Sequence, residues 1–539
     1  MRRSLFMIFA LAGSVQAQPP LIAYRGIWNA ASRMPAGLPG GAVSRGALFS
    51  ITGRNIGPTT TPALATPPQA TLGGVSIAVS QGTTTVAAIP IAFAPGRIDA
   101  LMPKDAPLGM VSVRVTYNNA RSNPMPMRVV ATQFGIFTMN GAGAGPAVMN
   151  NVADDLTEMP NTLQAPAMPG QAVTLLGTGL GSGALEVRVG GLKATGVIAS
   201  AFAMQPGVDA VSFNVPSDAP AGCWTPVYVK TAPGVVSNFA TMAISADGTA
   251  CQEPSNLLAS ALINGGNIGS YGLARVNVRH DAGVQTPRDA ITDLFAAFQG
   301  NEVVGPANFN PLFSLPPAGS CTVYAVAGDL VDPGVHLPGL VPPTGTGLLD
   351  AGQLTVLGKQ GTVNLSPATT GFGISQVQLG AAIPSLKLAN KLFLDGPVNV
   401  AVAGGADIGA ASGDVVPQMA FTWTNRDAVL SIDRTKAMAL NWSGGSPDAS
   451  TFVGGYATDM PANSTSLFLC MASVGSASFA VPADVMANLP VTRTSAIESR
   501  GVVFVGQWNV GGPVGMPATG LDFGLVLPIA VNAKTVRFQ

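Results

Sequence analysis

One short stretch occurs twice in this chain and constrains its fold more than any other feature. The first copy, GALFSITGRNIG, occupies residues 46–57, and the second, GQAVTLLGTGLG, occupies residues 170–181. Each copy opens on glycine, continues through β-branched and aliphatic residues, and closes on a turn bounded by glycines. This pattern is typical of a strand that leaves a sheet. The chain therefore contains a repeated β module.

The two copies remain aligned beyond this stretch. Equivalent residues follow in the same order, namely Pro103 with Pro216, Gly109 with Gly222, and Ser122-Asn123 with Ser237-Asn238. The spacing changes only between strands, where insertions cost little, whereas a slip of one residue within a strand would turn its core face outward. The sequence thus predicts two homologous sandwiches.

The composition favours an all-β protein. The chain has 65 Gly and 44 Pro, and only 10% of its residues are charged. Short Val, Ile and Thr runs bounded by turn residues recur throughout, and residues 111–117 alternate valine with polar side chains as a half-buried strand does. We expect tandem immunoglobulin-like sandwiches of the IPT/TIG type, followed by two further β-rich domains.

The first residues predict export. Arg2 and Arg3 precede an apolar run over residues 5–12, and Ala17 fits the position before a cleavage site. This is the pattern of a secretory signal peptide over residues 1–17. No later apolar run is long enough, without Gly or Pro breaks, for a spanning helix. We expect a secreted, cell-surface or periplasmic protein.

The predicted domain order follows from the repeat and from changes of composition. Residues 286–298 fit a strand, or a short helix with Pro287 in its first turn, and a linker is expected near residues 411–418. The expected units are a signal peptide (1–17), a lead-in segment (18–45), two sandwiches (46–132 and 133–250), a β-rich domain (251–415) and a last sandwich (416–539).

The charge balance argues against a nucleic-acid partner. Lys plus Arg and Asp plus Glu number 27 each, and no basic run is present. A protein that binds polyanions carries a basic excess on at least one face. The low charge density instead fits contact with a neutral surface or a sugar, and it fits an inert spacer equally well.

The four cysteines predict disulfides. They are Cys223, Cys251, Cys321 and Cys470, and an even number in an exported chain favours cross-links. Three connectivities are possible. We favour 223–251 and 321–470, because a short hairpin can bring the first two together. No Cys-x-x-Cys motif is present, and His280 and His336 are the two histidines, so no metal is expected.

Several motifs in order resemble a known family. They are WNAAS at 28–32, SITGRNIGP at 50–58, LGGV at 72–75, APGRIDA at 94–100 and FGIF at 134–137. Residues 22–247 resemble an uncharacterised C-terminal domain family of bacterial secreted proteins, which is Ig-like and close to IPT/TIG domains. The resemblance implies a sandwich fold and no catalytic residues, because none is assigned in that family.

The search for chemistry returns few candidates. His280 stands beside Asp281, but neighbours in a strand point to opposite faces, and no nucleophile elbow accompanies them. Asp154 and Asp155 follow two asparagines, which suggests calcium, yet the spacing of a calcium loop is missing, so a solvated turn is favoured. No cofactor is expected.

Two tryptophans of the last domain are candidates for glycan stacking. Trp423 and Trp442 lie in expected strands, and an exposed indole can cover the apolar face of a sugar. Core packing is the other interpretation, and the alternation of Trp423 with Phe421 favours it. A platform would require that both rings face solvent.

The sequence therefore predicts a non-enzymatic exported protein. Its Ig-like modules would present loops for adhesion or for contact with a protein or glycan surface outside the cytoplasm. The alternative is a carbohydrate-binding protein or hydrolase whose active part is residues 252–539. Loss of turnover on His280→Ala would favour the enzyme, and loss of glycan binding on Trp423→Ala would favour the sugar platform.

Overall fold

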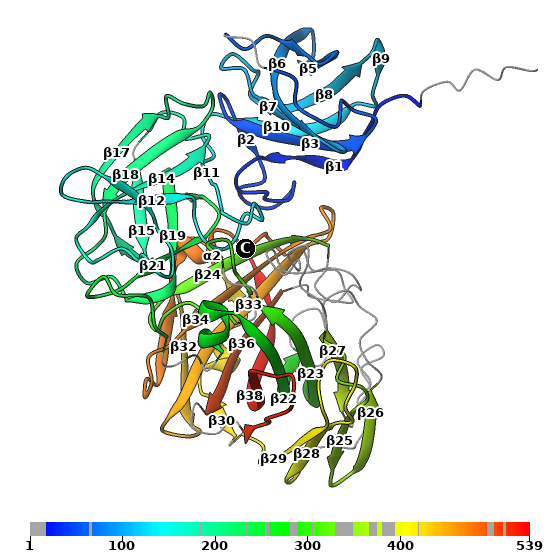
Figure 1. The fold of residues 1–539 in the computed structure, drawn as a ribbon, viewed down its shortest axis with the longest axis vertical. Coiled ribbons are helices and arrows are strands. Elements are labelled where there is room, and N and C mark those ends of the chain that lie inside the picture. The colour runs from blue at the N-terminus through cyan, green and yellow to red at the C-terminus, as the bar shows by residue number, and fades with distance from the viewer. Residues whose placement is uncertain are drawn as a thin grey trace, which may run out of the picture.

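The chain is almost entirely β-strand in the computed structural model (Figure 1). The structure describes residues 18–539 except 64–66, 184, 233, 254–255, 257, 281–287, 303–304, 312, 329–348, 366–373, 380–393, 419, 493–500 and 510–513. The expected signal peptide lies outside these residues. Within them, the helical segments are α1 (Ala259–Asn264), α2 (Ala483–Met486) and the 3₁₀ turn η1 (Arg426–Ala428). None of the described helices is long and apolar enough to cross a membrane.

The first sandwich contains the first copy of the repeat in its strand β3. Its strands are β1 (Leu21–Asn29), β2 (Val43–Ser44), β3 (Leu48–Arg54), β4 (Thr71–Leu72), β5 (Val75–Gln81), β6 (Thr84–Ala94), β7 (Arg97–Leu101), β8 (Gly109–Tyr117), β9 (Ala120–Arg121) and β10 (Met125–Val130). They follow the order β1-β3-β7-β6-β5-β8-β10-β2, with β6 pairing on both sides. Alternate Val, Ile and Phe side chains, such as Phe49 and Val113, fill the core between the faces.

The second sandwich repeats this plan around β14, which carries the second copy. Its strands are β11 (Gly135–Ile136), β12 (Met149–Val152), β13 (Glu158–Pro160), β14 (Ala172–Thr178), β15 (Glu186–Val189), β16 (Leu192–Lys193), β17 (Thr195–Ala201), β18 (Asp209–Asn214), β19 (Gly222–Ala232), β20 (Val235–Val236) and β21 (Ala240–Ile244). One sheet has the order β13-β12-β14-β18-β17, and the other has β16-β15-β19-β20. The expected tandem Ig-like sandwiches are confirmed.

A Ser-Asn pair closes the first sandwich. The Val115 N–H donates to Ser122 Oγ over 2.9 Å. The amide of Asn123 pairs with both backbone groups of Ile22, accepting from its N–H at 2.7 Å and donating to its carbonyl at 3.1 Å. The side chain of Asn123 thus supplies hydrogen-bond partners to the backbone of β1. This strand lies at a sheet edge, where backbone groups lack a neighbouring strand.

The equivalent Ser-Asn pair closes the second sandwich in the same way. The Val229 N–H donates to Ser237 Oγ over 2.9 Å. Asn238 accepts from the Ile136 N–H at 2.8 Å and donates to its carbonyl at 3.0 Å. Asn238 also donates to the Gly143 carbonyl at 2.8 Å. The residues matched in the sequence therefore make the same contacts in the two copies, which is strong evidence that the modules are homologous.

The C-terminal half is organised around one large sheet. Its strands have the order β24-β34-β33-β36-β38-β22-β23-β27, and two smaller sheets, β26-β25-β28-β29 and β30-β32-β35, accompany it. The strands are β22 (Gly266–His280), β23 (Arg288–Glu302), β24 (Cys321–Ala327), β25 (Leu354–Gly358), β26 (Gly361–Leu365), β27 (Ile374–Leu379), β28 (Val398–Val402), β29 (Ala411–Val415), β30 (Phe421–Trp423), β31 (Ser431–Ile432), β32 (Met438–Gly444), β33 (Ala449–Asp459), β34 (Ser464–Met471), β35 (Ser478–Val481), β36 (Gly501–Asn509), β37 (Val514–Gly515) and β38 (Phe523–Phe538).

The large sheet contains strands from both ranges, 251–415 and 416–539, that the sequence assigned to separate domains. β22 pairs in parallel with β38 at the C-terminus, and β24 pairs with β34. β23 covers most of residues 286–298, so of the two structures that the sequence allowed there, strand or short helix, the strand is correct. Strands that are far apart in the sequence therefore lie side by side in this sheet.

Apolar contacts join the second sandwich to the C-terminal half. A buried cluster contains Trp224 from β19 together with Phe309, Tyr324 and Leu525 from the C-terminal half. Nearby, Tyr228 donates to an Asp484 carboxylate oxygen at 3.1 Å, and Lys230 pairs with the same carboxylate at 2.8 Å. Burial, together with the negative charge of Asp484, raises the pKa of Tyr228 and keeps its hydroxyl protonated.

The two sandwiches also contact each other directly. The Leu48 N–H donates to Thr178 Oγ1 at 2.8 Å, and Ser44 Oγ donates to the Gly179 carbonyl at 3.0 Å. Leu48, Ile91 and Val208 form a small apolar cluster across this contact. The repeated strands β3 and β14 therefore lie close to the contact between their modules.

Candidate functional site

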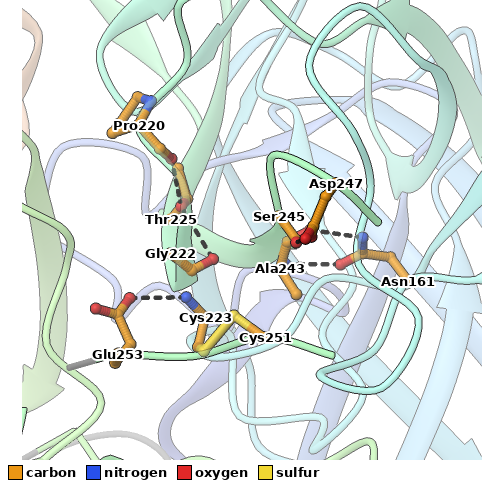
Figure 2. Close-up of a disulfide and its surroundings, with 10 residues drawn as sticks. All are labelled: Asn161, Pro220, Gly222, Cys223, Thr225, Ala243, Ser245, Asp247, Cys251 and Glu253. Atoms are coloured by element: carbon orange, nitrogen blue, oxygen red, sulfur yellow. Dashed lines mark hydrogen bonds between the residues drawn. A yellow bond between two sulfur atoms is a disulfide. The ribbon is translucent and has the colours of Figure 1, made fainter. Parts of the chain in front are cut away.

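The four cysteines form the two disulfides favoured by the sequence. Cys223 pairs with Cys251, with their Cα atoms 5.4 Å apart, and Cys321 pairs with Cys470 across β24 and β34. Figure 2 shows the first disulfide, where Glu253 accepts the Cys223 N–H at 2.8 Å. Burial raises the pKa of Glu253, although this hydrogen bond opposes the shift. The first disulfide holds the end of β19 to the following chain.

The two tryptophans that were candidates for a sugar platform lie in the core. Trp423 and Trp442 stand directly opposite each other in β30 and β32, and only 3% and 4% of their surfaces are exposed. The Trp423 indole N–H donates to Asn425 Oδ1 at 2.8 Å. The proposed stacking role is therefore corrected, because a buried ring has no free face for a sugar. Both tryptophans pack in the core, as the alternation of Trp423 with Phe421 favoured.

The other candidates of the sequence form no shared site within the described residues. His280 ends β22 opposite Arg288, whereas Asp281 and His336 lie outside the described residues. Asp155 accepts from the Thr157 N–H at 3.0 Å and from its hydroxyl at 2.7 Å, as in a solvated turn. No group of three or more metal-ligating side chains is found in the described part of the chain.

The same Asp-x-Thr turn occurs at three places. Asp155, Asp247 and Asp433 each accept from the hydroxyl and the N–H of the threonine two residues later. These hydrogen bonds, that from the threonine hydroxyl first, lower the pKa of each carboxyl, and that of Asp247 falls to about 2. These carboxylates are held in turns, which is a structural role.

A more promising surface is a bulge in β1, within the expected lead-in segment. Ile22 pairs with Gly53 and Ile27 with Ile51, so the residues between them on β1 stand opposite Thr52 alone. Both isoleucines are buried, and they fix the two ends of the bulge in the core. Bulges of this kind redirect side chains at sheet edges. Here the bulge interrupts the alternation of core-facing and solvent-facing side chains at residues 23–26.

The backbone of the bulge is constrained. Arg25 has a φ of 55°, in the left-handed region that a side chain with a Cβ rarely adopts. Gly26 is buried, and a Cβ there would lie 2.5 Å from Thr52 Oγ1, so only glycine fits. Such strain persists only where the surrounding structure enforces it, and it often accompanies binding sites.

The bulge holds Tyr24 out in solvent. The Tyr24 side chain is 79% exposed, the highest value among the aromatic residues of the described chain. The Arg25 guanidinium carbon lies 4.9 Å from the centroid of the Tyr24 ring, in a cation–π contact. The bulge therefore presents an aromatic ring with a cation on one face.

A turn of the C-terminal half anchors this pair. Arg25 Nη2 donates to the carbonyl of Pro461, in the turn between β33 and β34. Gly37 of the lead-in segment packs on Ala462, where a Cβ would clash with the alanine methyl. Arg25 takes part in none of the ion pairs found among the residues that the structure describes. The site thus lies where the first sandwich meets the C-terminal half, and its cation retains donors for a ligand.

The sequence alone missed Tyr24. It lies in the segment that was expected to be a lead-in, outside the two expected sandwiches. The available signal was the Tyr-Arg-Gly order between two core isoleucines, because Tyr24 and Arg25 break the alternation of a half-buried strand. The length of the bulge, however, depends on pairing with β3 and cannot be read from β1 alone.

Comparisons with known proteins give no family. No family profile matches the chain, and no curated protein sequence does. Among solved structures, the extracellular region of plexin A4 is 14% identical over 41% of this chain and 18% of its own, with a TM-score of 0.16. SGBP-B from a xyloglucan utilization locus of Bacteroides uniformis is 14% identical over 67% and 86%, also with a TM-score of 0.16. Domains 5–6 of the S-layer protein SbsC are 12% identical over 42% and 98%, again at 0.16. Superpositions this weak support no functional conclusion.

Proposed function

We propose that this chain is a non-enzymatic, exported binding protein that contacts a glycan through Tyr24 and Arg25. The observation that carries the proposal is the exposure of the Tyr24 ring, which is 79% solvent-accessible on a constrained bulge. Burying this much aromatic surface against a ligand is favourable, and the constrained backbone holds the ring in place for it.

Two features support export. Two disulfides, 223–251 and 321–470, cross-link the chain, and such bonds persist in oxidising compartments. The N-terminal sequence pattern independently predicts secretion.

The chemistry of the pair favours a sugar. A pyranose ring has an apolar face of C–H groups that stacks on an aromatic face, and hydroxyls that accept from a guanidinium. Arg25 covers one face of Tyr24 and leaves its remaining surface exposed. Because Arg25 is anchored by Pro461, the pair is held before the ligand arrives, which reduces the entropy cost of binding.

The test is a glycan array followed by titration calorimetry on the mature chain. Tyr24→Ala should weaken binding about tenfold, which corresponds to about 1.4 kcal/mol. Tyr24→Phe should bind nearly as well as the parent, because it keeps the ring. Met110→Ala, at a 60% exposed residue on β8, is the matched control. Unchanged binding by Tyr24→Ala would refute the proposal.

A protein partner is the second candidate. Met460, in the same turn as Pro461, is 49% exposed. Tyr, Arg and Met are all enriched at protein interfaces, and Tyr and Arg often supply most of the binding energy. The second function replaces the first if no glycan on the array binds, a surface protein does bind the chain, and Tyr24→Ala abolishes that protein binding.

A further inference from the structure

A second surface lies on the other sandwich, at the edge strand β17. β17 pairs with β18 on one side and is last in its sheet. All but one of its residues are exposed, including Ile198 at 68%. Monomeric proteins protect such edges with lysine, proline or bulges. Residues 195–202 include no charged residue and no proline, and the one protective feature is a bulge at Gly196–Val197.

The direction of the backbone groups follows from the ladder. The Phe202 N–H donates to the Val208 carbonyl at 2.9 Å, towards β18. Antiparallel strands alternate residues that hydrogen-bond inward with residues that face outward. Ser200 therefore bonds to β18, whereas the N–H and C=O groups of Ala199 and Ala201 face the open edge. They form a ready template for another strand.

We propose that β17 pairs with β17 of a second copy of this chain in an antiparallel arrangement about a two-fold axis. With the axis at Ser200, Ala199 of one copy faces Ala201 of the other, and both alanines use their N–H and C=O groups. Ile198 then stands opposite Phe202 of the second copy. An exposed apolar side chain thus gains an apolar neighbour across the strands.

Other features of the chain favour a second copy as the occupant. The strand is complementary to itself in this register, and no like charges meet. The chain has 27 basic and 27 acidic residues, or 25 and 27 without residues 1–17, so two copies repel little at long range. Phe202 packs on the apolar cluster of Leu48, Ile91 and Val208, which anchors the chain at the end of β17. An anchored strand loses less entropy on pairing than a free one.

The dimer should be weak. Two short edge strands bury less than the roughly 800 Å² per partner of a standard interface. Association is therefore expected to depend on concentration, with rapid exchange between one and two chains. The pairing is independent of the Tyr24 site, so failure of one proposal leaves the other standing.

Sedimentation velocity over rising concentration tests the pairing on the mature chain. The parent should shift towards the mass of two chains, and Ala199→Pro should remain a single chain. Proline removes only an outward N–H at this position, so the ladder with β18 survives. Ile198→Lys should also remain single, whereas Met110→Lys, a charge placed on the first sandwich, should behave as the parent. A parent that stays single throughout, or an Ala199→Pro variant that still pairs, overturns the proposal.

Hydrogen exchange provides a measurement that needs no variant. The amides of Ala199 and Ala201 should exchange quickly in dilute protein and several-fold more slowly in concentrated protein, while the Ser200 amide should change little. Equal exchange of Ala199 and Ala201 at the two concentrations would also refute the pairing.

Discussion

The repeated Ser-Asn pair predicts different costs for the same substitution in the two sandwiches. Asn238→Ala removes hydrogen bonds to the Ile136 N–H, the Ile136 carbonyl and the Gly143 carbonyl, and Asn238 is only 5% exposed. Asn123→Ala removes the two equivalent bonds to Ile22 in a half-buried setting. Each variant is therefore the matched control of the other.

The magnitude follows from the groups left without a partner. A buried donor or acceptor that loses its partner costs about 1–3 kcal/mol, and such costs do not add fully. Asn238→Ala should lower the free energy of unfolding of the second sandwich by about 3–4 kcal/mol. Asn123→Ala should cost about 1–2 kcal/mol, because Asn123 is only half-buried and water entering its place can replace part of what is lost.

Hydrogen exchange at individual modules is the suitable assay, because a chain of several modules does not unfold in one step. The Ile136 amide should lose protection strongly in Asn238→Ala, and the Ile22 amide more mildly in Asn123→Ala. Urea midpoints followed by circular dichroism should fall in the same order. Equal losses in the two variants, or a larger loss in Asn123→Ala, would refute the reasoning from burial.

Two further predictions concern charged groups. Asp484→Asn should loosen the contact between the second sandwich and the C-terminal half by about 1 kcal/mol, because the pair with Lys230 is 19–23% exposed, and faster exchange along β19 would report it. Unchanged exchange would count against a contribution from this pair. Titration by NMR should place the pKa of Asp247 near 2, below its ordinary 3.8, so its hydrogen bonds are fully present above 3.8 and are lost as the pH falls through about 2. Thr249→Val should raise this pKa, and an unshifted value would show that the threonine hydroxyl does not hold the carboxylate.

The sequence predicted those parts of the fold whose residue pattern is local and occurs more than once. The strands at 46–57 and 170–181 could be recognised because glycine bounds each copy, and Asn123 and Asn238 because each follows a serine at a matched place. The two disulfides followed from the short spacing of one cysteine pair, which left one partner each for Cys321 and Cys470.

The parts that the sequence did not predict depend on distant pairing. Nothing local in β22 shows that it will lie beside β38 at the other end of the chain, so the shared C-terminal sheet had no signal in composition. Trp423 and Trp442 could be placed in strands, but whether their shared face meets solvent or a core depends on the cluster above them. The Tyr24 bulge likewise exists only because β3 fixes both of its ends.

The position of Tyr24 follows from contacts that the first sandwich cannot make alone. Arg25, which lies against the Tyr24 ring, is held by the carbonyl of Pro461, more than four hundred residues later in the chain. Without that acceptor, Arg25 would regain its rotamer freedom and would no longer order the ring. The left-handed backbone at Arg25 would then lack one of the contacts that offset its strain. The fixed orientation of the ring is thus a property of the assembled chain, and an excised sandwich would present a more mobile Tyr24.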